Sequence, residues 1–281
     1  MNNLSDVTFL IPVRIESNDR FRNLIMSVSY LLKNTNANII VMESDNEQQV
    51  PKAIAKVLKE NNKNSDKITY IFEQSEESMF HKTRLLNHML IESNTPIVVN
   101  YDCDVVLPIS SYELAANMCR KEYDLVYPFS FGDNAQLRVN LNSEDIAHFM
   151  NNSDLSILKG FSWKAEHGFC QFFKRSSYIS GFMANEDFLS YGPEDSEMGM
   201  RWDRLGYKVG RVDNLVYHFE HTRSHNSDSR NPYMQSNHNL FQTLKNMNKK
   251  GLEDYYKDQD YYKNNLKKIA KNILVLSELN K

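Results

Sequence analysis

Residues 96–107 read Pro-Ile-Val-Val-Asn-Tyr-Asp-Cys-Asp-Val-Val-Leu, an apolar strand that ends in two aspartates. Asp102 and Asp104 are two residues apart, so on extended backbone their side chains point the same way and both carboxylates can face one ligand. Ligands of open α/β sheets gather at the carboxyl ends of the strands, and two hard oxygen donors there suit Mg²⁺ or Mn²⁺ carrying a diphosphate. The alternative is a polar turn at a strand end, where aspartate is common.

The chain before this segment alternates between strand patterns and helix patterns. Strand-like apolar runs cover residues 7–13, 39–42, 68–72 and 97–99, and helical spacing of apolar residues covers residues 21–32, 51–60 and 83–91. Strands that alternate with helices predict an α/β fold built on a mostly parallel sheet. We expect a single sheet flanked by helices.

The pattern is less regular after the aspartate pair. From about Tyr123 the chain has aromatic residues, short apolar runs and one predicted helix at 143–151, which indicates a substrate-binding region beside the sheet. The last 37 residues carry nine lysines against five acids and predict a helical tail. Its apolar stripe is predicted at Leu266, Ile269, Ala270, Ile273 and Leu274. We favour a tail packed on the domain with a solvated lysine face; the alternative is a helix that contacts a membrane surface or a partner.

The composition excludes several classes of protein. The chain of 281 residues is long enough for a substantial core, and 41% hydrophobic and 25% charged residues are typical of a soluble protein. A net charge of -3 offers no attraction for nucleic acid. Three scattered cysteines without CxxC spacing argue against a disulfide framework or a structural zinc site. The start is polar and no apolar run reaches the roughly 18 residues of a membrane span, so we expect a cytoplasmic protein, with the inner face of the membrane as an alternative location for the tail.

A pair of histidines follows in the second half, where residues 216–221 read Val-Tyr-His-Phe-Glu-His. On a helix or a tight turn His218 and His221 lie on one side and can hold one metal, whereas on a regular strand they point to opposite faces and leave one ligand. Because imidazole favours first-row transition ions, a site that combines Asp104 with both histidines favours Mn²⁺ over Mg²⁺. The alternative is that one histidine is solvated or caps a backbone group.

An acidic helix start occurs at residues 190–197, Ser-Tyr-Gly-Pro-Glu-Asp-Ser-Glu, before an apolar stripe that ends near Gly206. Glu194 and Asp195 either complement the positive end of the helix dipole or supply a general base for an acceptor hydroxyl.

A basic helix start occurs at residues 79–87, Met-Phe-His-Lys-Thr-Arg-Leu-Leu-Asn. Positive charge is unfavourable at a helix N-terminus, so Lys82 and Arg84 predict an anion such as a diphosphate nearby. The alternative is two solvated basic side chains.

These segments, in this order, resemble the β-1,4-galactosyltransferase family and the broader family 2-like inverting glycosyltransferases of GT-A type, from Val7 to about Met247. Five segments carry the resemblance. In the first half of the chain, Phe9-Leu-Ile-Pro-Val-Arg is similar to the family's IPFR segment, Phe80-His-Lys-Thr-Arg-Leu-Leu-Asn to FNRAKLLN, and Tyr101-Asp-Cys-Asp-Val to SDVDL. In the second half, Tyr191-Gly-Pro-Glu-Asp is similar to WGGED, and His218-Phe-Glu-His with Asn231-Pro232 is similar to MIRH followed by NP. The chain departs from the family where Pro193 replaces a glycine, Tyr191 a tryptophan and His218 a methionine.

The resemblance implies a GT-A catalytic domain at 1–232, with a nucleotide-binding half at 1–105 and an acceptor and metal half at 106–232, followed by the tail at 233–281. It implies Asp195 as catalytic base, Glu194 as a substrate-positioning neighbour, Tyr191 in a loop that closes over the donor, and Mn²⁺ or Mg²⁺ on Asp104, His218 and His221. The donor-binding residues that it implies are Pro12, Val13, Arg14, Glu16, Phe80, Lys82, Asp102, Cys103, Tyr191 and Gly192.

The implied activity is transfer of a hexose or N-acetylhexosamine from a UDP-sugar to a hydroxyl of a glycan or lipid-linked acceptor, in surface polysaccharide synthesis. Two other functions use the same residues. A metal-dependent hydrolase or nucleotidyltransferase would consume nucleotide phosphates without a sugar acceptor, and a glycan- or nucleotide-binding subunit would have no activity.

Overall fold

The computed structural model describes residues 3–61 and 65–279, and its strands form two sheets. The strands are β1 (Val7–Val13), β2 (Asn38–Asp45), β3 (Ile68–Gln74), β4 (Ile97–Tyr101), β5 (Val105–Val106), β6 (Leu125–Tyr127), β7 (Gly132–Val139), β8 (Gly160–Ala165), β9 (Cys170–Lys174), β10 (Val209–Arg211) and β11 (Val216–Phe219). The helices are α1 (Asn18–Asn34), α2 (Val50–Asn61), α3 (Lys82–Glu92), α4 (Ile109–Lys121), α5 (Ser143–Asn152), α6 (Arg175–Ser180), α7 (Glu194–Leu205), α8 (Met234–Asn246), α9 (Lys249–Asp258) and α10 (Asp260–Leu279), with short 3₁₀ turns η1 (Ser65–Lys67), η2 (Leu155–Ile157) and η3 (His225–Ser227).

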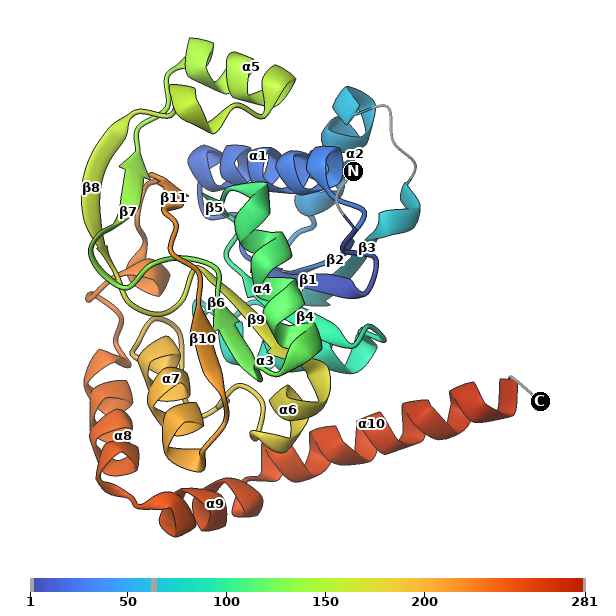
Figure 1. Cartoon of the computed structure of the whole chain (residues 1–281), viewed down its shortest axis with the longest axis vertical. Helices are drawn as coiled ribbons and strands as arrows, with labels where there is room; N and C mark the ends of the chain where they lie inside the picture. Colours follow the sequence, from blue (N-terminus) through green and yellow to red (C-terminus); the bar gives the residue numbers. More distant parts are fainter. Residues whose placement is uncertain (1–2, 62–64, 280–281) are drawn as a thin grey trace.

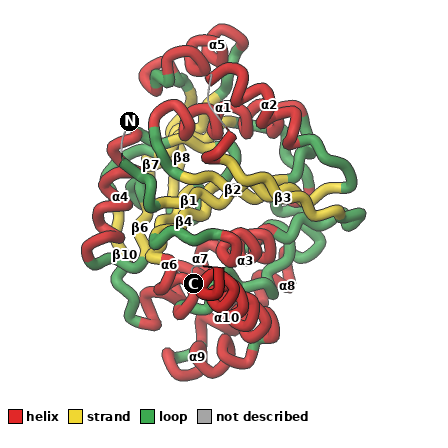
Figure 2. The backbone as a smooth tube through the Cα atoms, turned by 90° about the vertical axis from the view of Figure 1, so that its right-hand side faces the viewer, coloured by secondary structure: helices red, strands yellow, loops and turns green. Residues whose placement is uncertain are grey.

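The larger sheet has seven strands in the order β10-β6-β9-β4-β1-β2-β3. Strands β4, β1, β2 and β3 run parallel, and β9 pairs antiparallel with both β4 and β6. Every residue of β1 and β4 is buried, because helices lie on both faces of the sheet: Figure 2 shows α1 and α2 above it and α3 and α7 below it. The predicted α/β fold, a mixed sheet flanked by helices, is confirmed.

The prediction of one sheet is wrong, because β5, β11, β7 and β8 form a second sheet of four strands. In Figure 1 this sheet stands at one side of the molecule, with β7 and β8 at its outer edge. Strand β8 is exposed along almost its whole length, although Phe161, Trp163 and Ala165 alternate with polar residues in a strand pattern that the sequence analysis did not assign. Its pairing with β7 and the pairing of β11 with β5 and β7 join residues far apart in the chain.

Local signals set the helix boundaries. Helix α1 begins after Ser17, whose hydroxyl accepts a hydrogen bond from the backbone N–H of Arg20 at 3.2 Å. Helix α7 ends at Gly206, which has φ of 88°, a left-handed conformation that suits glycine at this position. The predicted helices at 21–32, 51–60, 83–91 and 143–151 are all present, each within a few residues of its predicted ends.

The segment after Pro232 is helical, and its first helices pack on α7. Figure 1 shows α10 extending outward from the lower edge of the body. In α10 only part of the predicted apolar stripe is buried: Ile269 is, whereas Leu266 and Ala270 are exposed. The side chains of Ile273 and Leu274 lie outside the described residues. No helix in the described part of the chain has the length and hydropathy of a membrane span.

A buried ion pair joins the tail to α7. Arg201 and Glu197 lie one turn apart, both at most 1% exposed, with Nε to Oε1 at 2.9 Å. The Tyr256 hydroxyl of α9 donates to Glu197 Oε1 at 2.5 Å, and the Arg201 guanidinium lies 4.4 Å from the centre of the Tyr256 ring. Because α7 carries Asp195 at its start, this contact positions a candidate catalytic carboxylate.

We expect Arg201→Met to lower the free energy of unfolding by about 3–5 kcal/mol, because it leaves the Glu197 carboxylate buried without its counter-charge. Chemical denaturation followed by circular dichroism measures the change. The matched control is Lys250→Met, which removes an i,i+4 ion pair with Asp254 whose side chains are 83% and 60% exposed, and which should change stability by at most about 1 kcal/mol. Equal effects of the two substitutions would contradict the structural role of the buried pair.

Candidate functional site

One cavity of about 510 Å³ lies where the two sheets meet. Its lining brings together nearly every residue that the sequence singled out, from segments that lie more than 200 residues apart in the chain. Those residues are Pro12, Arg14, Glu16, Phe80, Lys82, Asp102, Cys103, Asp104, Tyr191, Gly192, Glu194, Asp195, His218 and His221. Val13 is not among the lining residues, because its side chain points into the core and is 1% exposed.

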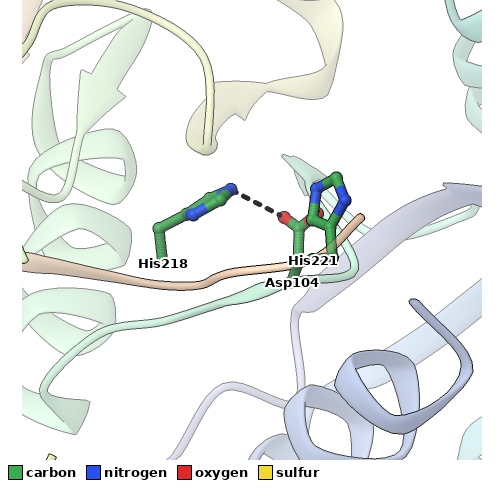
Figure 3. Close-up of side chains that lie close together, drawn as sticks. All are labelled: Asp104, His218 and His221. Atoms are coloured by element: carbon green, nitrogen blue, oxygen red, sulfur yellow. Dashed lines mark ion pairs between the residues drawn. The ribbon is translucent and has the colours of Figure 1, made fainter. Parts of the chain in front are cut away.

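Asp104, His218 and His221 form a compact cluster in this cavity. One ligand atom from each lies within 4.8 Å of the others. His221 Nε2 is 3.1 Å from Asp104 Oδ2 and His218 Nε2 is 3.9 Å from Asp104 Oδ1, and Figure 3 shows the two rings on either side of the carboxylate. His218 is on β11, but His221 follows the end of the strand, so the opposite-face geometry of a regular strand does not apply. Both histidines therefore reach the same ligand position.

Neighbouring acceptors orient both imidazoles for metal binding. His218 Nδ1 is 3.1 Å from Glu220 Oε1, and His221 Nδ1 is 2.8 Å from the carbonyl oxygen of Thr222. When the Nδ1–H groups donate to these acceptors, each Nε2 presents its lone pair toward Asp104. Glu220 is itself held by two 2.6 Å hydrogen bonds from Arg138. A carboxylate and two oriented imidazoles fit a divalent first-row ion.

Asp102 lies in the same cavity but outside this cluster. Its carboxylate pairs with Lys82 Nζ at 3.1 Å. Both aspartates line the cavity, and the expectation that they face one ligand stays a prediction. Lys82 Nζ also lies 3.5 Å from Asp195 Oδ2 and 3.9 Å from Glu194 Oε1. The lysine expected beside phosphates is thus surrounded by three carboxylates.

Burial and the charges around Lys82 shift the pKa values of Lys82 and Glu194. Burial would lower the pKa of Lys82, but the charges of Asp102, Asp195 and Glu194 outweigh it and hold that pKa well above the ordinary value. Burial, with the neighbouring charge of Asp195, raises the pKa of Glu194 to about 8. The Oε2 atom of Glu194 is buried and has no hydrogen-bond partner among the described residues. Glu194 therefore keeps a proton at neutral pH that it can donate to a ligand.

Asp195, at the start of α7, faces a glycine that the sequence analysis did not single out. Gly168 has φ of 86°, and a Cβ on it would lie 2.7 Å from Asp195 Oδ2. A larger residue would therefore clash with the carboxylate as well as strain the backbone. Gly168 gives Asp195 the space to face the cavity.

The opposite end of the cavity is formed by the ends of β1 and α3. Arg14 donates to the carbonyl oxygens of Ser44 at 2.7 Å and Glu77 at 2.9 Å, and its guanidinium lies 5.9 Å from the centre of the Phe80 ring. Its Nη2 is buried without a partner among the described residues, which leaves a donor for a ligand. Arg84, in contrast, pairs with Glu73 at 2.5 Å and does not line the cavity, so its predicted contact with an anion is not present.

Comparisons with known proteins show the fold of the chain. No protein-family model and no curated protein sequence matches the chain. Among solved structures, mannosyltransferase PcManGT from Pyrobaculum calidifontis, in complex with GDP-Man and Mn²⁺, matches 97% of this chain and 75% of its own with a TM-score of 0.53 at 15% identity. GalNAc-T7, with UDP, GalNAc and Mn²⁺, matches 77% of this chain and 43% of its own with a TM-score of 0.54 at 11% identity. The chain has the GT-A fold.

In this GT-A fold the cavity also contains residues that the sequence analysis missed. Arg20 lies on the first turn of α1 against the metal cluster, and its basic charge at a helix start is the same signal that drew attention to Lys82. Trp163 lies on β8 and lines the cavity while 50% exposed, two residues after the exposed Phe161 of the same strand. His167 lines the cavity next to Gly168, and its Nδ1 is buried without a partner among the described residues.

Asp104→Asn should weaken Mn²⁺ binding by more than about 100-fold, because it removes the one anionic ligand of the cluster. Substitution of a residue that only hydrogen-bonds to a metal ligand typically costs less, about 10- to 100-fold. Isothermal titration of Mn²⁺ into the full chain measures this. Asp133→Asn, an exposed aspartate on β7, is the control and should leave the affinity unchanged. Retention of Mn²⁺ affinity by Asp104→Asn would mean that the cluster is not the metal site.

The buried carboxyl of Glu194 predicts a pH dependence of stability. An ordinary glutamate has a pKa of 4.5, and in the folded chain the pKa of Glu194 is about 8. Between pH 4.5 and about pH 8 the folded state keeps a proton on Glu194 that the unfolded state has released. The contribution of Glu194 to the free energy of unfolding therefore falls as pH rises and levels off above about pH 8. The stability of Glu194→Gln relative to wild type should therefore increase from about pH 5 to about pH 9. Denaturation at several pH values tests this, and a difference that stays constant would contradict it.

Proposed function

We propose that the protein is a metal-dependent inverting glycosyltransferase that transfers a hexose or N-acetylhexosamine from a UDP-sugar to a hydroxyl of a glycan or lipid-linked acceptor. The observation that carries the proposal is the single cavity that joins Asp104, His218 and His221 to Asp195. The GT-A fold and the Mn²⁺ in both matched structures support it.

In the proposed reaction the chain's own residues supply a base and position the reactants. A Mn²⁺ or Mg²⁺ ion held by Asp104, His218 and His221 would neutralise charge that develops on the departing nucleotide diphosphate. Asp195 accepts the proton of the acceptor hydroxyl, and the acceptor oxygen attacks the anomeric carbon from the face opposite the leaving group, which inverts its configuration. Lys82 Nζ lies 3.5 Å from Asp195 Oδ2, so Lys82 holds the carboxylate in place at the start of α7.

The donor end of the cavity supports a nucleotide. Phe80, stacked by Arg14, offers a ring for a base, and the buried unpartnered Nη2 of Arg14 offers a donor for a carbonyl or phosphate oxygen. The resemblance to β-1,4-galactosyltransferases favours uridine and a galactose-type sugar. One matched structure contains GDP-Man, so guanosine donors belong in any test.

The acceptor end of the cavity supports a glycan. Phe161 and Trp163 lie two residues apart on β8, on the same face, and are 45% and 50% exposed. The Arg138 guanidinium lies 5.2 Å from the Phe161 ring and 5.7 Å from the Trp163 ring, which stabilises both. Exposed, rigid aromatic faces suit the apolar face of a sugar ring. These rings support a glycan acceptor, whereas the role in surface polysaccharide synthesis rests on the family resemblance.

The test uses purified full-length protein with Mn²⁺ and a panel of UDP- and GDP-sugars, with and without oligosaccharide acceptors. We expect one donor to be consumed with release of its nucleoside diphosphate, and Asp195→Asn to lower kcat by about 10²–10⁴-fold, because the general base is lost. The control is Asp203→Asn, an exposed aspartate on the same helix, which should retain full activity.

Three outcomes decide between the functions. Donor turnover that needs a sugar acceptor supports the transferase, and inverted anomeric configuration in the product supports the direct displacement. Consumption of nucleotide substrates that no acceptor accelerates would favour a hydrolase or nucleotidyltransferase. Binding without turnover would favour a glycan- or nucleotide-binding subunit.

A further inference from the structure

Arg20 places a buried positive charge directly against the candidate metal ligands. Its Nη1 lies 3.6 Å from Asp104 Oδ2, and its side chain is only 15% exposed. Nη2 lies 3.5 Å from His221 Nδ1 and 3.4 Å from His221 Nε2. Because the two distances are nearly equal, the guanidinium contacts the imidazole ring as a whole and favours neither nitrogen. A divalent ion on Asp104, His218 and His221 would therefore have a guanidinium as its immediate neighbour.

The remaining contacts of Arg20 do not satisfy its donors. Its Nε is buried without a hydrogen-bond partner among the described residues, and the contact of Nη1 with Cys103 Sγ is long, at 3.9 Å. For comparison, Arg138 makes two 2.6 Å hydrogen bonds to Glu220 in the same cavity. A guanidinium presents its donors in a planar fork that matches phosphate oxygens. Arg20 lines the cavity and has donors to spare for such an anion.

Two neighbouring cations repel each other unless an anion lies between them. Asp104 carries one negative charge and cannot offset both a guanidinium and a divalent ion. A diphosphate, which binds divalent ions and guanidinium groups alike, can supply the missing negative charge. Of the other cationic groups in the lining, Lys82 pairs with three carboxylates, Arg138 with Glu220 and Lys164 with Glu166. Arg14 and Arg223 form no ion pair among the described residues, but Arg20 differs from them in its direct contact with Asp104 and His221.

We propose that Arg20 makes binding of the divalent ion and binding of the donor's diphosphate mutually dependent. Arg20 lowers the affinity of the Asp104, His218 and His221 cluster for the ion alone, and it binds the diphosphate when ion and nucleotide are present together. The ion is then held firmly only with a donor. This inference rests on the proposed function for the identity of the anion, whereas its effect on the ion alone does not need a nucleotide.

The experiment measures Mn²⁺ affinity of the full chain by isothermal titration, with and without saturating UDP and, separately, GDP. The affinity of each nucleotide for Mn²⁺ in buffer is measured first and included in the fit. The variants are Arg20→Gln, which removes the charge, and Arg20→Lys, which keeps it. Arg120→Gln is the matched control, because Arg120 pairs with Asp6 on the surface away from the cavity. Thermal melting checks that each variant is folded.

We expect Arg20→Gln to bind Mn²⁺ alone at least about tenfold more tightly than wild type, because the repulsion is removed. In the same variant, the factor by which nucleotide improves Mn²⁺ affinity should fall at least about tenfold. A change of this size is within the usual range for coupling between two ligands. Arg20→Lys should bind Mn²⁺ alone as wild type does, and Arg120→Gln should match wild type in both measurements.

The inference would be overturned if Arg20→Gln bound Mn²⁺ alone as wild type does, or more weakly, while nucleotide still improved its Mn²⁺ affinity by the wild-type factor. Arg20 would then be a structural counter-charge for Asp104. If Arg20→Gln does not fold, tighter Mn²⁺ binding by Arg20→Lys than by wild type would overturn it instead. Failure of the proposed function has a different signature: wild type would bind Mn²⁺ alone but neither UDP nor GDP. In that case the effect of Arg20→Gln on Mn²⁺ alone still decides whether the guanidinium opposes the ion.

Discussion

The pairing of β11 with β5 is the interaction on which the candidate site depends. It is antiparallel, with His218 opposite Val105, and the backbone N–H of Phe219 donates to the carbonyl oxygen of Asp104 at 2.8 Å. This pairing places an imidazole from the end of the domain beside a carboxylate that follows the fourth strand of the chain. Helix α1 braces the same segment, since Asn23 donates to the carbonyl of Phe219 and Arg22 to that of Glu220, each at 3.0 Å. The second sheet therefore brings together the residues of the candidate metal cluster.

Charge balance is the second constraint on the cavity. Four of the acidic side chains in the lining contact a largely buried cation: Arg20 lies against Asp104, and Lys82 lies among Asp102, Glu194 and Asp195. Buried charges are stable only when they are paired or hydrogen-bonded, so these cations are part of the folded structure as well as of any ligand site. The raised pKa of Glu194 is consistent with one cation that cannot fully compensate three carboxylates.

The position of Asp195 depends on contacts far from the cavity. Asp195 is in the first turn of α7, and this helix is held by the Arg201–Glu197 pair and by Tyr256 of the tail. The tail thus supports the helix that carries the candidate base, while Gly168 keeps the space in front of that base open. Together these contacts fix the position of the candidate base in the cavity.

The sequence by itself determined the elements with strong local signals. Apolar runs predicted β1 and β4, helical spacing predicted α1, α3 and α7, and Gly206 predicted the end of α7 in the left-handed conformation that it adopts. The order of the motifs also pointed to half of the residues that line the cavity. Such features depend on a few neighbouring residues, so their signal survives in the linear chain.

Only the tertiary structure decided which charges meet. Strands β5 and β11 are too short to show an apolar pattern, and the alternation in β8 does not determine which strand it pairs with. The pairing of these strands joins distant parts of the chain. Lys82 and Arg84 have the same local signal, yet Lys82 enters the cavity and Arg84 pairs with Glu73 outside it. Arg20 and Gly168 gain their roles from Asp104 and Asp195, which are 84 and 27 residues away in the sequence (104 − 20 and 195 − 168). Long-range packing sets these contacts, because a side chain's partner in space is not encoded by its neighbours in sequence.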